Sequence, residues 1–545
     1  MRKELLFIVP PCVSISELLP DENKTFSNKI RKEVPLGALS LATYLESYTQ
    51  ANVRILDLNL KFYELVNERK FDECHTLERY VREFVSQYQN EAIDFCGISA
   101  IFSPAYGYLD MISKIVKEFF PNAVVAAGGG VPSNLIQNVF SDAPCIDFIS
   151  YGEGEIALLG FVASEDEKKY LEDSPSLTTR EKEEKGFQCS FEFIENLDDI
   201  PPLDFSLIEF EKYSGHVHAQ TREKVVALPL MFSRGCPFDC CFCASHSIHG
   251  KRVRYNSLER IKSDIKLFTE TYQVNTITVW DDNFFVDKKQ AIALLDYFMG
   301  LNLAVEFVNG FPVYRMDDDM ARLLKQSGID VVTLAIESGS PRVLKDIIHK
   351  PLKLEMVPKA IQCLRKYDIY TKGLFVIGFP GETLEDIQTT MEFIHSSGLN
   401  WVDIYIASPL PGSELYDICK SKGYLKREDP SSCNFWSGNI ETEHFHAAQM
   451  EEIQVYNTVK KDFVNNLDMR QGNWERALIN FEYVIHAKHK NPFAYYYGAK
   501  AAKELGRLEK AEEYYKEYWN IREQSEEWER LIQRFIAESV EFSNL

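Results

Sequence analysis

The segment Phe232-Ser-Arg-Gly-Cys-Pro-Phe-Asp-Cys-Cys-Phe-Cys-Ala244 carries the most specific pattern of the 545-residue chain. Cys236, Cys240 and Cys243 follow the spacing Cys-x3-Cys-x2-Cys, and Cys241 lies inside the last gap. The glycine and the proline let the backbone curl, so three thiolates on one short loop can converge on a single inorganic centre. Thiolates are soft ligands, which select zinc or an iron–sulfur cluster.

The spacing alone leaves both of these metals open. A closed structural zinc site needs four ligands, so zinc would have to recruit Cys241 or a histidine such as His246 or His249. A cluster held by three thiolates instead leaves one iron open to a substrate or a cofactor. Motifs elsewhere in the chain have to decide between the two.

Short apolar runs alternate with helix-forming sequence on the carboxyl side of the cysteine loop. With the run that precedes the loop they make six expected strands, which suits an open (β/α)6 barrel with its site at the carboxyl ends of the strands. Polar or glycine-rich motifs follow these runs: Asp281-Asp282, Glu337-Ser338-Gly339-Ser340, Gly378-Phe-Pro-Gly-Glu-Thr383 and Pro409-Leu-Pro-Gly-Ser413.

The cysteine spacing, the aromatic Phe242 before the last cysteine and the ordered strand-end motifs resemble the radical S-adenosylmethionine (SAM) superfamily. The resemblance implies a 4Fe–4S cluster on Cys236, Cys240 and Cys243, with Cys241 a bystander. It further implies that SAM is held by Phe242, Asp281, Asp282, Glu337, Ser338 and Gly378. Two alternatives remain: Asp281-Asp282 as a hydrogen-bonded turn or helix cap, and Lys350 as a surface lysine or a partner of the SAM carboxylate.

The amino-terminal third also alternates strands with helices, which predicts a Rossmann-like, doubly wound parallel sheet. Ligands of such sheets lie at the carboxyl ends of the strands. Three motifs fall there: Ser99 with Ser103, Gly128-Gly-Gly130, and Gly152-Glu-Gly-Glu155. No Gly-x-Gly-x-x-Gly follows the first strand, so a nicotinamide dinucleotide fits poorly.

This region resembles the cobalamin-binding domain of B12-dependent radical SAM enzymes. The resemblance implies that cobalamin contacts Ser99, Ser103, Gly128, Gly129, Gly130, Gly152, Glu153 and Gly154. No Asp-x-His-x-x-Gly triplet is present, so it implies base-off cobalamin without a protein histidine on cobalt. The alternative is a degenerate sheet that holds no cofactor.

The predicted organisation has four parts. Residues 1–165 form the cobalamin-binding domain, 166–220 a charged linker, 221–430 the radical SAM domain and 431–545 an all-α region. In the last part Gly472-Asn-Trp-Glu-Arg-Ala477 and Gly506-Arg-Leu-Glu-Lys-Ala511 recur at the tetratricopeptide period. Fewer than two units are present, so we expect this tail to pack on the barrel, either as a grip for a peptide or protein or as a structural lid.

Composition and charge argue against some partners and cellular locations. The formal charge of −22 argues against a nucleic-acid partner, whose phosphates need a basic face. The sequence contains no run of about eighteen apolar residues, so no membrane span is predicted. The amino-terminal run through Val9 is expected to be a strand and not a signal peptide, and a chain with twelve cysteines then suits the reducing cytoplasm.

The resemblance implies a C-methyltransferase. In the implied cycle the 5′-deoxyadenosyl radical takes a hydrogen atom from an unactivated carbon, and methylcobalamin then supplies the methyl group. A flavodoxin or ferredoxin would supply electrons. Two alternatives stay open: cyclisation, oxidation or rearrangement with the same cofactors, and a non-catalytic metal-binding scaffold. A peptide, a natural-product intermediate and a lipid all remain possible substrates.

Overall fold

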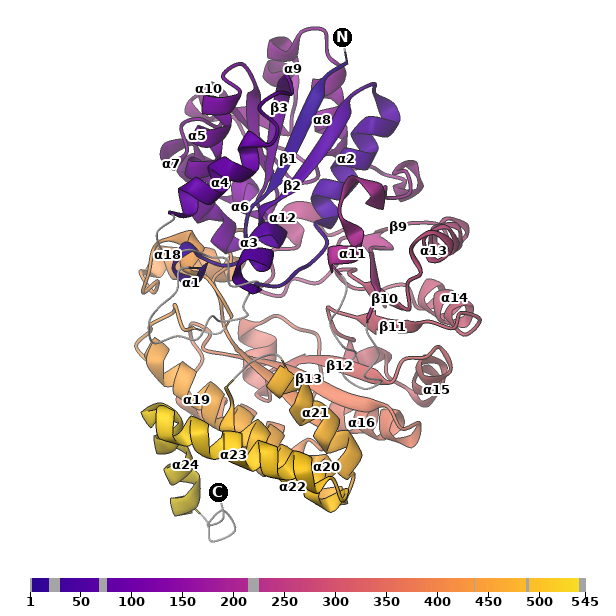
Figure 1. The fold of residues 1–545 in the computed structure, drawn as a ribbon, viewed down its shortest axis with the longest axis vertical. Coiled ribbons are helices and arrows are strands. Elements are labelled where there is room, and N and C mark those ends of the chain that lie inside the picture. The colour runs from indigo at the N-terminus through magenta and orange to yellow at the C-terminus, as the bar shows by residue number, and fades with distance from the viewer. Residues whose placement is uncertain are drawn as a thin grey trace.

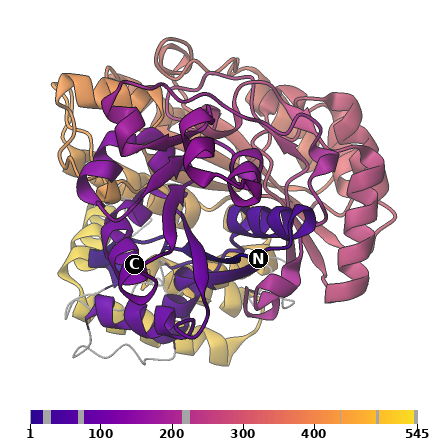
Figure 2. The same cartoon turned by 90° about the horizontal axis from the view of Figure 1, so that it is seen from above.

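The computed structural model describes residues 2–18, 30–67, 76–213, 225–435, 437–486 and 490–538. The amino-terminal sheet and the carboxyl-terminal helices lie at opposite ends of the long axis, with the strands of the second half between them (Figure 1). Seen from above, the indigo and purple amino-terminal elements lie nearest the viewer and cover part of the yellow carboxyl-terminal helices (Figure 2).

The amino-terminal sheet has six strands in the order β2-β1-β3-β4-β5-β6. The first five are parallel and β6 is antiparallel to β5. Side chains alternate between two separate apolar cores: Leu6 and Ile8 pack on one face of β1, and Leu5 and Phe7 on the other. Both faces are therefore covered, as predicted for a doubly wound sheet. The strands are β1 (Glu4–Val9), β2 (Asn52–Asp57), β3 (Ile93–Ser99), β4 (Val124–Gly128), β5 (Phe148–Ser150) and β6 (Leu177–Thr179).

Helices cover this sheet and connect its strands. On the β1 face that carries Leu5 and Phe7, the core includes residues of α2 and α8; the opposite core includes residues of α4 and α5. The main helices are α2 (Leu36–Tyr48), α3 (Leu58–Asn67), α4 (Leu77–Ser86), α5 (Leu109–Phe119), α7 (Ile136–Asp142) and α8 (Glu155–Ala163).

The segment expected to be a linker adds to the sheet. It contains α9 (Glu167–Asp173), β6 and α10 (Arg180–Glu184), and β6 pairs with β5 through Ile149 opposite Thr178. Neither of the two helices buries a side chain. A three-residue edge strand has too short a pattern to be recognised in sequence.

The second half contains two three-stranded parallel sheets, β11-β10-β7 and β12-β13-β14. An isolated parallel bridge between Phe311 and Leu334 connects them. One large apolar core includes residues from both sheets and from the helices between the strands. The strands are β7 (Ala227–Leu230), β10 (Thr276–Val279), β11 (Ala304–Phe307), β12 (Val331–Glu337), β13 (Tyr370–Ile377) and β14 (Trp401–Ile406).

A helix stands between most successive strands of this half. Their caps are visible in the sequence: Thr383, for example, forms a capping box with Asp386 at the start of α17. The helices are α13 (Leu258–Tyr272), α14 (Lys288–Phe298), α15 (Asp318–Gln326), α16 (Met356–Lys366), α17 (Leu384–Ser396) and α18 (Glu414–Lys422).

The described part of the carboxyl-terminal tail consists of helices after residue 447. They are α19 (Ala447–Val459), α20 (Leu467–Gln471), α21 (Trp474–His486), α22 (Pro492–Glu504), α23 (Leu508–Gln524) and α24 (Glu526–Glu538). Phe463 and Phe481 share an apolar core with Tyr370 and Trp401, the first residues of β13 and β14. The prediction that the tail packs on the strands is confirmed. This core lies at the amino ends of β13 and β14, whereas Met450 of α19 packs beside Gly378, just after the carboxyl end of β13.

Within the described residues, no helix combines the length and the apolar character needed to cross a membrane.

Candidate functional site

The cysteine loop is closed at its base by two short strands. β8 (Ser233–Arg234) pairs antiparallel with β9 (Arg254–Tyr255), so the chain from 235 to 253 leaves and returns at one point. Gly235 has φ +100°, and a Cβ there would lie 2.5 Å from the carbonyl oxygen of Arg252. Only glycine fits this turn, which directs the loop immediately before Cys236.

The structure brings the three predicted ligand thiols together. Cys236, Cys240 and Cys243 are half-buried and free of disulfides. Burial raises the pKa of all three thiols, and the proximity of the other cysteines raises it further at Cys240, to about 11, and at Cys243, to about 12. Cys236 contributes to the raised pKa of both Cys240 and Cys243, so the three thiols lie near one another, and a bound metal would replace their protons.

Cys241 and His249 do not join this group. Cys241 lies in the apolar core, where its amide donates to the Ile348 carbonyl and its own carbonyl accepts from Leu415. His249 contacts Glu153 through Nδ1 at 2.9 Å. Across the described ranges, no three His, Cys, Asp or Glu side chains are grouped to hold a single metal ion. Two of the candidates for the fourth zinc ligand therefore have other partners. Three thiolates that each bind a different iron of a larger cluster fit the loop better.

The double carboxylate after β10 supports the cysteine loop. Asp281 is buried and accepts hydrogen bonds from the Phe232 amide (2.7 Å) and the Ser233 hydroxyl. Asp282 accepts from the Gly235 amide at 2.9 Å, and its charge raises the pKa of Cys236 and Cys243. Both carboxylates are therefore hydrogen-bonded to the start of the cysteine loop, and Asp282 is the one whose charge acts on the thiols.

Glu337 ends β12 in an unusual conformation. It has φ +73°, in the left-handed region, and the register of β12 against β13 shifts between Ala335 and Glu337. Its carboxylate accepts a hydrogen bond from Lys350 Nζ at 2.8 Å, and the lysine side chain is only 17% exposed. The surface interpretation of Lys350 is wrong: it lies beside the cysteine loop, where its charge partly offsets the burial that raises the pKa of Cys240. Strain of this kind is concentrated at functional sites.

Ser338 is buried and hydrogen-bonded within the protein. Its hydroxyl lies 3.0 Å from that of Thr390 and accepts from the Ser340 amide. These contacts fix the turn after Glu337.

The glycine-proline turn after β13 lies near Phe242. The Phe242 and Phe379 rings have centroids 6.0 Å apart. The amides of Gly378 and Phe379 both donate to Glu382 Oε2, at 2.7 and 3.0 Å. Burial raises the pKa of Glu382 to about 8, and its Oε1 is buried without a partner in the described structure. Glu382 is a further candidate site residue that was not predicted, although its place in the Gly-x-Pro-Gly-Glu run is a signal for it.

The carboxyl edge of the amino-terminal sheet has features that fit a bulky, largely apolar ligand. Ile101 and Phe102, between Ser99 and Ser103, are 49% and 47% exposed. Ser150 Oγ is buried without a hydrogen-bond partner among the described residues. The Gly128–Gly130 run keeps backbone free of side chains at this edge. An open apolar wall, an unpartnered hydroxyl and exposed backbone agree with the donor and packing groups that cobalamin needs.

Glu153 differs from the other predicted cobalamin contacts because its carboxylate has several charged protein partners. Its carboxylate accepts from Arg254 Nη1 at 2.9 Å, lies 3.2 Å from Arg234 Nη1 and contacts His249. Burial would raise the pKa of Glu153, but the hydrogen bond from His249 and the arginine charges outweigh it and lower the pKa to about 2. The predicted cobalamin contact of Glu153 thus competes with a full set of protein partners.

A glycine pair tests the requirement for close backbone approach. A Cβ on Gly129 (φ +97°) would lie 2.8 Å from the Ala100 carbonyl oxygen, whereas one on Gly186 (φ +75°) meets nothing within 4 Å. We expect Gly186→Ala to cost about 1 kcal/mol of unfolding free energy, from backbone strain alone. Gly129→Ala should cost about 2 kcal/mol more because the Ala100 strand end has to shift. Urea unfolding measures both, and equal losses would contradict the close approach at Gly129.

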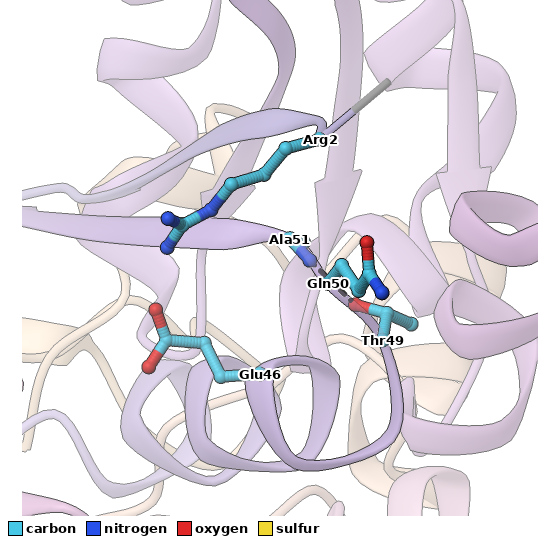
Figure 3. Close-up of a pocket in the computed structure, with 5 residues that line it drawn as sticks. All are labelled: Arg2, Glu46, Thr49, Gln50 and Ala51. Atoms are coloured by element: carbon cyan, nitrogen blue, oxygen red, sulfur yellow. Dashed lines mark hydrogen bonds between the residues drawn. The ribbon is translucent and has the colours of Figure 1, made fainter.

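A separate surface hollow lies at the other end of the same sheet. Figure 3 shows Arg2, Glu46, Thr49, Gln50 and Ala51 around it, before β1 and β2 begin. Glu46 Oε1 accepts from the Val53 amide at 2.9 Å, so its carboxylate already has a backbone partner. This hollow is remote from the strand ends that carry the motifs.

Comparison with known proteins agrees with this geometry. The model of the Radical SAM superfamily matches residues 230–394, which include the cysteine loop and strands β10–β13. An uncharacterised methyltransferase of Pyrococcus horikoshii is 28% identical over 360 residues, covering 66% of this chain and 76% of the relative. Cytidylyl-2-hydroxyethylphosphonate methyltransferase of Streptomyces wedmorensis is 28% identical over 427 residues, covering 72% and 79%.

A solved structure extends the likeness to nearly the whole chain. The radical SAM methyltransferase TsrM of Kitasatospora setae, with cobalamin and a 4Fe–4S cluster bound, matches with a TM-score of 0.59 at 14% identity. The match covers 95% of this chain and 99% of that one, and at this identity it shows the shared fold.

These findings define the class first: residues 230–394 of the chain match the radical SAM domain, and the named relatives indicate an enzyme. Within the class, its resemblance to the cobalamin-dependent radical SAM enzymes, predicted from the strand-end motifs, is confirmed by the named relatives and the shared fold.

Proposed function

We propose that this chain is a cobalamin-dependent radical SAM methyltransferase acting on an unactivated carbon. The observation that carries the proposal is the contact between the loop that carries three free cysteines and the carboxyl edge of the amino-terminal sheet. Asn134, which follows the Gly128–Gly130 run, donates to the Ser247 hydroxyl on the far side of the cysteine loop at 2.8 Å. The segments that carry the two proposed cofactor sites are thus in direct contact.

The chain's own residues hold and orient these groups. Cys236, Cys240 and Cys243 would ligate the cluster, and Gly235 with Asp282 sets the start of their loop. Lys350, held by Glu337, keeps a positive charge beside the thiols and would offset the negative charge of a thiolate-ligated cluster. When bound, the cluster and SAM supply radical chemistry and cobalamin supplies a methyl carrier.

We further propose how the predicted SAM residues divide. Phe242 and the Gly378 turn would line an adenine contact, supported by the proximity of Phe242 to Phe379. Asp282 and Glu337 would face the methionine end beside the thiols. Asp281 and Ser338 would act through the backbone they hold.

For cobalamin, the proposed contacts are the residues that border the exposed apolar wall and the unpartnered Ser150 hydroxyl. They are Ser99, Ser103, Gly128, Gly129, Gly130, Gly152 and Gly154.

Two finer features of the fold belong to the proposal. We infer that the six strands β7, β10–β14 act as one open (β/α)6 barrel, supported by the Phe311–Leu334 bridge. We also infer that α21–α24 are tetratricopeptide-like, since Gly472 and Gly506 both adopt positive φ just before a new helix. The division at 165, 220 and 430 stays a prediction, with β6 assigned to the first part.

The products formed from SAM test the reaction. Anaerobically reconstituted protein with hydroxocobalamin, SAM and a strong reductant should form S-adenosylhomocysteine as well as 5′-deoxyadenosine. Methyl transfer to cobalamin requires the first product, and radical formation gives the second. Liquid chromatography with mass spectrometry measures both.

The alternatives have separate outcomes in this assay. Formation of 5′-deoxyadenosine alone would favour cyclisation, oxidation or rearrangement. Protein that binds no iron and sulfide, or leaves SAM intact, would support a non-catalytic scaffold. A flavodoxin or ferredoxin as electron donor, the cytoplasmic location and the substrate class stay predictions.

A further inference from the structure

The base of the cysteine loop holds two arginines that face each other. Arg234 on β8 is the register partner of Arg254 on β9. Directly opposite like charges destabilise an antiparallel pair. Both side chains are nearly buried, with 12% and 2% exposed, so solvent does not screen their repulsion.

Two carboxylates from the amino-terminal sheet neutralise this pair. Glu153 accepts from Arg254 Nη1 at 2.9 Å and Nη2 at 2.5 Å and lies 3.2 Å from Arg234 Nη1. Glu155 accepts from Arg234 Nη2 at 2.8 Å and also from the Ser40 hydroxyl at 2.8 Å. The glutamate side chains are 3% and 5% exposed. Two positive and two negative charges therefore balance in a buried cluster, which we call the loop clamp.

Other contacts fix the clamp in one geometry. Arg254 also donates to the Ile194 carbonyl at 2.8 Å, and its guanidinium lies 4.2 Å from the Phe193 ring centroid. Gly152 has φ +73°, and a Cβ there would lie 2.7 Å from the Phe191 ring. The backbone that presents Glu153 is therefore held as tightly as its carboxylate.

Buried ion pairs contribute little net stability, because desolvation offsets their attraction, but they favour one arrangement over others. The arrangement favoured here places the base of the loop two residues before Cys236. Residues that orient metal ligands in this way affect affinity for the metal without touching it.

We propose that Glu153 and Arg234 are positioning residues: the amino-terminal sheet clamps the base of the cysteine loop and thereby sets the three thiols for the cluster. The inference rests on the proposed function. It also assigns the Gly152–Glu155 loop a role in positioning the cluster, besides its place at the proposed cobalamin site. The cluster held by the radical SAM domain is then positioned by the amino-terminal domain.

Glu153→Gln tests the clamp, because it keeps the shape of the side chain and removes its charge. After anaerobic reconstitution and a chelator challenge, this variant should retain about one tenth of the wild-type iron and sulfide. Adding SAM should also change the electron paramagnetic resonance signal of its remaining reduced cluster, and this change should differ from the one that SAM causes in the wild type. Glu195→Gln is the matched control: Glu195 pairs with Arg252 of the same loop, but both side chains are exposed, so iron should stay at the wild-type level.

A restoring variant separates charge balance from damage to the fold. Glu153→Gln with Arg254→Gln leaves one arginine facing Glu155, so the double variant should recover most of the lost iron. Should Glu153→Gln fail to give the wild-type circular dichroism spectrum, Glu155→Gln is measured in the same way, with the same expected loss.

Three results would overturn the inference. The first is wild-type iron retention and an unchanged spectrum in folded Glu153→Gln. The second is an intact cluster with hydroxocobalamin binding weakened about tenfold, which would place Glu153 in the cobalamin site. The third is a double variant no better than the single one. A wild-type chain that takes up no cluster would instead overturn the proposed function itself, so the two failures are distinguishable.

Discussion

Cys240→Ala is expected to reduce iron and sulfide after reconstitution to background and to abolish reductive SAM cleavage. Cys240 is the middle cysteine of the converging group, and its pKa responds to Cys236, Glu337 and Lys350. Two remaining thiolates leave two irons without protein ligands, so a cubane cluster is not retained. Iron and sulfide analysis with the 5′-deoxyadenosine assay measures the loss.

The adjacent Cys241→Ala is the matched control. Cys241 lies in the apolar core with its backbone bonded to Ile348 and Leu415, so its replacement should cost about 1 kcal/mol of stability and leave the cluster intact. A four-ligand zinc site that used Cys241 would instead lose its metal in both variants. Equal metal loss in the two variants would therefore contradict the three-thiolate assignment.

The site's framework was predictable because it depends on local sequence. Parallel strands bring their carboxyl ends to one edge, so a motif that follows a strand has its place fixed once the strand is recognised. Gly235, Gly129 and Gly378 show this clearly: each occupies a positive-φ turn just where the sequence ends an apolar run. The cysteine loop itself is short enough that its spacing determines which thiols meet.

The partners of the charged residues were not predictable in the same way. Glu153 and Arg254 are 101 residues apart, and no local pattern links them. For Lys350 the sequence leaves a surface position and a SAM contact open, whereas the structure pairs it with Glu337 at 2.8 Å. The Glu153–Arg254 pair depends on how two domains meet, and a single sequence does not contain that information.

Asp281 gives the second large expected effect, and it separates the two interpretations of the Asp281-Asp282 motif. Asp281→Ala leaves the Phe232 amide and the Ser233 hydroxyl buried without an acceptor. This should lower the free energy of unfolding by about 3 kcal/mol. Because Phe232 and Ser233 lead directly into the cysteine loop, cluster retention should fall as well. A direct SAM ligand would give the opposite pattern: stability and iron unchanged, with weaker SAM binding.

Asp281→Asn is the control, and it adds a dependence on pH. Burial raises the pKa of Asp281 to about 7 from its ordinary value of 3.8, despite the hydrogen bonds from Ser233 and Phe232. A raised carboxyl pKa means that the folded state binds the proton more tightly, so this contribution to stability is complete below about pH 4 and is lost as pH rises through about 7. Asparagine keeps an acceptor and does not titrate, so urea unfolding at pH 5 and pH 8 should differ less in Asp281→Asn than in the wild type. If the free energy of unfolding changes equally with pH in the two proteins, Asp281 is ionised in the folded state. The loop would then be held by a buried carboxylate and not by a neutral carboxyl.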